Sequence, residues 1–80
     1  MTNSIIVKAE WDAEAKVWVA TTDDVAGFVA EAESFDALQP RVMAVLADLI
    51  ELNGFDSDLA EIPVHIVASR TERIGNPQAA

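Results

Sequence analysis

Two pairs of acidic residues are the side chains in this sequence best suited to chemistry: Asp23 with Asp24, and Glu31 with Glu33. Carboxylates that converge in a pocket can hold two metal ions and support hydrolysis, as in nucleases. Here the first pair begins a turn, and the second lies on the outer face of a short strand at the edge of the expected sheet. A solvated turn and a charged edge that prevents aggregation explain both pairs without chemistry. A metal-dependent hydrolase or nuclease that uses the acidic turn is therefore an alternative, and we predict no catalytic and no metal-binding residue.

The other candidates for chemistry are isolated. His65 is the one histidine, and a strand histidine without a second histidine or a cysteine nearby is more often a surface residue than a base or a ligand. The sequence has no cysteine, which excludes disulfides and thiolate metal sites. The three glycines, at positions 27, 54 and 75, are too scattered for a phosphate-binding loop. We expect neither an enzyme nor a cofactor.

Composition and charge narrow the class of partner. The 80 residues include 14 acidic and 5 basic ones, a net charge of −9, which would repel nucleic acid. An apolar fraction of 51% is enough for a folded core. No apolar run approaches the roughly 18 residues that a membrane span needs, and no basic-then-apolar signal segment opens the chain. We therefore expect a cytoplasmic protein with no membrane contact.

Three strands are expected in the first part of the chain, at residues 5–11, 16–22 and 28–33, because apolar and polar residues alternate there. We predict a first hairpin in which Trp11 lies opposite Lys16, so that Ala9 faces Trp18 and Val7 faces Ala20. In this register both tryptophans lie on the inner, core-facing side of the sheet. Between the second and third strands, Gly27 supplies the permissive backbone of a tight turn.

One helix and one last strand follow. Ser34 is a suitable helix N-cap, apolar residues then recur at three- and four-residue steps, and Asn53-Gly54 ends the pattern. Pro40 interrupts the pattern and predicts a kink or a restart. A last strand at residues 62–70 would return beside the first and parallel to it.

These elements predict an α+β fold of order β-β-β-α-β. A three-stranded antiparallel meander is joined by a C-terminal strand parallel to the first, in the sheet order 3-2-1-4, and one helix packs on one face. We predict a single domain over residues 1–70 and a flexible C-terminal tail over residues 71–80, where Gly, Asn and Pro occur without periodicity.

The face of the sheet opposite the helix is the most informative surface. In the expected register its apolar side chains lie among charged ones and neighbour one another across strands, as in an interaction surface. We therefore predict that it binds a partner. The predicted contact residues are Ile6, Val17, Val19, Val29, Glu31, Glu33 and Val67.

The stretch from Asp23 to Leu38 resembles the HicB-like antitoxin domain. That family reads an aromatic strand, a Pro-Asp-Leu-Pro-Gly-like turn, a short strand and a Gly-Asp-Thr-Leu-Glu-like helix start. The matching residues are Trp18, Asp24, Val25, Gly27 and then Glu33 to Asp36, whereas Asp23, Ala26 and Ala32 depart from the pattern. The chain looks closer still to a sister group of short bacterial proteins known only as a domain of unknown function. The segments that carry this second resemblance are 5–12, 17–20 and 46–53.

The resemblance covers about residues 4–70. It implies the fold given above, a reduced relative of the ribonuclease H sheet, with Asp24, Gly27 and Ser34 as its structural motif. It also implies a homodimer and, in true antitoxins, binding of a small basic ribonuclease toxin. Residues 71–80 are too few for a helix-turn-helix, so we expect no nucleic-acid binding by this chain alone. The expected function is a non-enzymatic protein-interaction module, and an orphan structural dimer is a further alternative.

Overall fold

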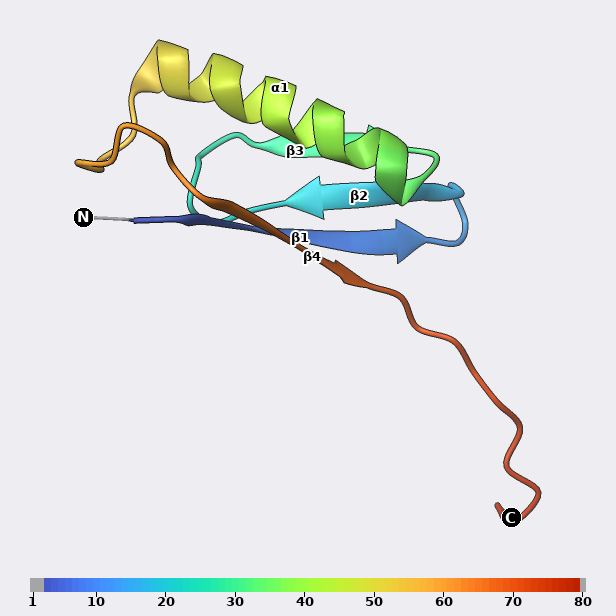
Figure 1. Ribbon diagram of the computed structural model, residues 1–80. Coiled ribbons are helices and arrows are strands. Elements are labelled where there is room, and N and C mark those ends of the chain that lie inside the picture. The colour runs from blue at the N-terminus through green and yellow to red at the C-terminus, as the bar shows by residue number, and fades with distance from the viewer. Residues whose placement is uncertain (1–2, 80) are drawn as a thin grey trace.

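The sheet has the strand order β3-β2-β1-β4 (Figure 1). In the computed structural model, which describes residues 3–79, β1 (Ile5–Asp12) pairs antiparallel with β2 (Val17–Thr21), and β2 pairs antiparallel with β3 (Val29–Ala32). Helix α1 (Phe35–Asn53) leads to β4 (Val64–Ser69), which pairs with β1 in parallel. The predicted fold class and strand order are confirmed. Residues 1–2 of the predicted domain and residue 80 of the predicted tail lie outside the described residues.

Strand β1 explains why the sheet has one buried and one open face. Its alternate residues Ile5, Val7 and Ala9 are fully buried, while Ile6, Lys8 and Glu10 between them are exposed. Because successive side chains of a strand point to opposite faces, this alternation fixes which face of the whole sheet meets the helix.

The register of the β1–β2 hairpin differs from the predicted one. Trp11 lies opposite Trp18 and Ala9 opposite Ala20, so the predicted pairs of Trp11 with Lys16, Ala9 with Trp18 and Val7 with Ala20 are wrong. The shift is two residues, an even number, so every side chain stays on the predicted face.

Turn chemistry explains this register. The Asp12 carboxylate accepts hydrogen bonds from the amides of Glu14 (3.1 Å) and Ala15 (3.0 Å), and the Asp12 carbonyl accepts from the Lys16 amide (2.7 Å). Lys16 has a φ of 58°, in the left-handed region that ends such a turn. Lys16 therefore belongs to the loop, and the last paired residues are Asp12 and Val17.

Helix α1 begins and ends where capping chemistry predicts. The Ser34 hydroxyl accepts from the Ala37 amide at 3.1 Å, and Gly54, with a φ of 77°, donates its amide to the Ile50 carbonyl at 2.7 Å. The helix continues without a break through Pro40, so the predicted restart is wrong. Pro40 deprives the Asp36 carbonyl of its helical partner, but both residues are exposed and water can take the missing place.

The helix lies mainly over β3 and partly over β2 (Figure 1). Its buried residues Leu38, Val42 and Leu46 face the sheet, and the small side chains of Ala30 and Ala32 let it approach β3 closely. The helix covers the opposite edge of the sheet, at β4, less completely. On β4, Val64 and Ile66 are only half-buried and Ala68 is exposed. Among the described residues, no helix is long and apolar enough to cross a membrane.

Replacing Leu38 tests how much the packing of α1 on the sheet stabilises the fold. Leu38→Ala should lower the free energy of unfolding by about 2–5 kcal/mol, because it removes a fully buried side chain and leaves a cavity. Leu52→Ala is the matched control. Leu52 lies on the same helix with 79% of its surface exposed, so the change should stay within about 0.5 kcal/mol. Urea denaturation of both variants gives the comparison, and equal losses would contradict the burial of Leu38 in the core.

Candidate functional site

The face of the sheet opposite α1 is uncovered (Figure 1), and we call it the open face. It carries the outward side chains of all four strands. Ile6, Val29 and Val67 are 49%, 55% and 55% exposed. Val17 and Val19 are half-buried, and Glu31 on β3 is exposed, as is Glu33 just after that strand. The structure thus places the predicted contact residues on or beside one surface, while their role in binding stays a prediction.

Apolar and polar side chains alternate across the open face. The valines are at most diagonal neighbours across strands, because the register sets each valine directly opposite a polar or charged residue. The opposed pairs are Val19 with Glu10 and Glu31, Val17 with Asp12, Val67 with Lys8, and Val29 with Thr21. This mixture keeps the face soluble and still offers apolar contact area at several points.

Negative charge dominates this surface. Within residues 3–79, the strands direct Glu10, Asp12 and Glu31 outward, against one lysine, Lys8, and one exposed histidine, His65 on β4. His65 lies opposite Ile6 in the parallel pair. A partner with lysines or arginines spaced to meet these carboxylates would gain both steering and specificity.

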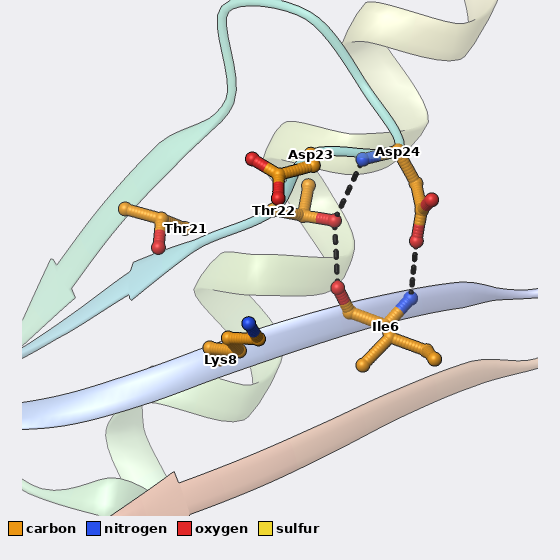
Figure 2. Close-up of a pocket in the computed structure, with 6 residues that line it drawn as sticks. All are labelled: Ile6, Lys8, Thr21, Thr22, Asp23 and Asp24. Atoms are coloured by element: carbon orange, nitrogen blue, oxygen red, sulfur yellow. Dashed lines mark hydrogen bonds between the residues drawn. The ribbon is translucent and has the colours of Figure 1, made fainter.

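The acidic turn between β2 and β3 has a structural role (Figure 2). Asp24 Oδ2 accepts a hydrogen bond from the Ile6 amide at 2.8 Å, and Thr22 Oγ1 donates to the Ile6 carbonyl at 2.6 Å. Thr22 Oγ1 also accepts from the Asp24 amide at 3.1 Å. The last backbone pair of this ladder is Lys8 with Thr21. The two side chains therefore continue the pairing of β1 beyond the end of β2.

A shallow hollow of about 380 Å³ lies at this turn, on the open face. Its lining residues are Ile6, Lys8, Thr21, Thr22, Asp23 and Asp24 (Figure 2). Among residues 3–79, no three His, Cys, Asp or Glu side chains are grouped as a metal ion would require. Asp24 already accepts a backbone amide, and Glu31 lies on another strand. The hydrolase alternative therefore stays a hypothesis, which metal titration can test.

The tryptophans form an aromatic row on the helix side of the sheet. The ring centroids of Trp11 and Trp18 are 5.7 Å apart, and those of Trp18 and Phe35 are 5.6 Å apart, both in edge-to-face geometry. Both tryptophans are only half-buried. They therefore border the core, whereas we predicted them as part of it. The Arg70 guanidinium lies 5.0 Å above the Trp11 ring, a cation–π contact that joins the end of β4 to the hairpin.

Sequence reasoning missed the pairing role of Thr22 and the burial of Val25. The spacing Thr-x-Asp is a signal for local bonding, because such side chains readily bond to a backbone amide two residues away. The bonds to Ile6 had no local signal, since they depend on where β2 ends against β1. Val25 is buried in the core although it lies within a polar turn.

Comparison with known proteins supports the fold and leaves the role open. Residues 4–75 match a family described as a domain of unknown function (DUF1902). The chain is also similar to a crystal structure of the hypothetical protein TTHA1013 from the extremely thermophilic bacterium Thermus thermophilus, with 34% identity and a TM-score of 0.69. That similarity covers 91% of this chain and 99% of the other. Comparison with curated proteins gives no match.

Removing the carboxylate of Asp24 should weaken the fold. Asp24→Ala takes away the acceptor of the Ile6 amide, and we expect the free energy of unfolding to fall by about 1–2 kcal/mol. Asp23→Ala is the matched control, because the Asp23 carboxylate makes none of the described bonds to β1 and its loss should change little. Thermal or urea unfolding measures both, and an unaffected Asp24→Ala would contradict the pairing role.

Titration with Mg²⁺ or Mn²⁺ tests the hydrolase alternative. We expect no heat of binding at millimolar metal. The Asp24 carboxylate is engaged with the Ile6 amide, and among the described residues no three potential ligand side chains are grouped to hold a metal ion. Isothermal titration calorimetry is the measurement. A saturable heat that Asp23→Ala abolishes would instead support a metal site at the turn, since this variant keeps the bonds that hold the fold.

Proposed function

The chain belongs to the family of the domain of unknown function DUF1902, and from that premise we propose that it is a non-enzymatic protein-interaction module. It self-associates, and its open face binds a small basic protein in the cytoplasm. The observation that carries the proposal is the open face itself, a sheet surface without a covering layer on which exposed apolar side chains alternate with carboxylates.

The composition of the open face suits a protein partner better than a small molecule. Ligand pockets are concave and bury most of their ligand, whereas this surface spreads over four strands with a shallow hollow at its end. Val19 lies near its middle between Glu10 and Glu31. A partner that inserts apolar groups beside Val19 and places cations over the two glutamates would bury a mixed surface of the usual kind.

The resemblance to HicB-like antitoxins supports a finer version of this proposal. In that version the partner is a small basic ribonuclease toxin, and the acidic open face neutralises it by covering the basic groups that the toxin needs to hold RNA. The net charge of −9 favours fast association with such a partner. The acidic open face and the negative net charge also suit a basic partner that is not a toxin.

A charge reversal on the open face tests the proposal. Co-expression with a small basic protein encoded beside the gene should give a complex that weakens as salt rises. Glu31→Lys should raise its dissociation constant at least about tenfold, because it places a cation against the basic partner. Glu51→Lys on α1 makes the same charge change away from the face, at an exposed site, and should have a much smaller effect.

Light scattering on a sizing column gives the mass of the complex, and calorimetry gives its affinity. Circular dichroism confirms that both variants remain folded. Two results would contradict the proposal: no complex with any such neighbour at low salt, or equal weakening by the two reversals.

A further inference from the structure

The C-terminal arm, residues 70–79, leaves the body of the protein. After β4 ends at Ser69 the chain runs away from both the sheet and the helix (Figure 1). The radius of gyration is 15.9 Å and the longest dimension is 55 Å. A compact chain of this length has a radius of gyration of about 11.6 Å. The arm stays near the hairpin only at its start, where Arg70 lies above Trp11 and residues 71–73 border a hollow beside Glu10 and Trp11. Its later residues extend away from the domain (Figure 1).

The arm continues from the open edge of the sheet. Within the described residues, strand β4 has β1 on one side and no strand on the other. The opposite edge is better protected, because β3 has only four residues and Arg41 Nη1 donates to the Glu31 carbonyl at 3.1 Å. Strand β4 has six residues and no proline or acidic side chain. It is the edge at which another strand can add.

Strand β4 and the arm both leave apolar surface exposed, and each could cover the exposed surface of the other. On the helix side of β4, Ala68 is exposed and Ile66 is half-buried, because α1 lies over β3 and β2. On the arm, Ile74 is 95% exposed. Strand alternation places even-numbered residues of β4 on the helix side, and Arg70, above Trp11, follows that alternation. Continued along the arm, it puts Ile74 on the same side as Ile66 and Ala68.

Charge favours an exchange between two copies. Residues 1–69 hold 13 of the 14 acidic residues and 3 of the 5 basic ones, a net charge of −10. Residues 70–80 hold Arg70, Arg73 and Glu72, a net charge of +1. Two bodies of this charge repel each other, and an arm of opposite sign that reaches onto the other body offsets part of that repulsion.

We propose that two copies of this chain associate by exchanging their arms. The arm of each copy adds antiparallel to β4 of the other, so that a two-fold axis through the β4–arm junctions relates the copies and the two sheets become one continuous sheet. Ile74 of one copy then covers the incompletely buried helix side of the other copy's β4. This assembly rests on the self-association in the proposed function, and it leaves both open faces free for a basic partner.

Truncation after Ser69 is the direct test. Sedimentation equilibrium of the full chain should give twice the chain mass of 8.6 kDa, and the truncated chain should be monomeric at the same concentrations. Ile74→Asp should raise the dimer dissociation constant at least about tenfold. Leu52→Asp, the same kind of change at an exposed apolar residue of α1, should leave the dimer intact.

Hydrogen exchange supplies a second readout, because amides of residues 71–74 should be protected only at concentrations where the dimer forms. A truncated chain that remains dimeric overturns the arm exchange, and if Val19→Lys then dissociates it, the open face is the dimer contact and self-association stands. A full chain that is monomeric throughout overturns both the exchange and the proposed self-association, while binding of a basic partner by the open face is still measured separately.

Discussion

Pairing on both sides of β1 is the constraint on which the rest of the structure depends. The strand exchanges backbone hydrogen bonds with β2 along one edge and with β4 along the other, and its inner residues Ile5, Val7 and Ala9 have no exposed surface. Because a strand held on both sides cannot slip without breaking two ladders, β1 sets the register of the sheet. At its beginning, where β2 has already ended, Thr22 and Asp24 maintain the contact to Ile6 with side chains in place of backbone.

Much of this arrangement could be predicted from local patterns. Alternation located the strands, and Ser34 and Gly54 located the ends of α1, because the groups that stop a helix lie within a few residues of its end. The need for a helical crossover made β4 parallel to β1. The restart predicted at Pro40 was wrong. The cost of a proline inside a helix depends on where the carbonyl that loses its amide partner lies, and here that carbonyl is in the exposed first turn.

The details of the site could not be predicted, because they depend on the hairpin register. Two four-residue loops compete in the sequence, and the chain takes the one in which the Asp12 carboxylate binds two amides and Lys16 adopts a positive φ. That choice moves each residue of β2 by two positions along β1. As a result Val19 lies between Glu10 and Glu31, whereas the predicted register would have set it opposite Lys8. The predicted face of each side chain was right because the shift is even. The predicted cross-strand partners were wrong because each residue of β2 moved by two positions.

A single helix on a four-stranded sheet leaves coverage uneven. Helix diameter with side chains is about 10–12 Å, whereas four strands spaced at about 4.8 Å span more than that, so one helix cannot cover every strand equally. Here α1 follows β3 directly, after a tight connection at Ser34, and therefore lies over that edge of the sheet. The strand left least covered is β4, at the opposite edge. Extending the sheet with a strand from another chain, or covering β4 with apolar side chains from outside, are the two ways to complete its coverage. The chain continues from β4 into an arm that can do both, which connects the position of the helix to the way this small domain would associate.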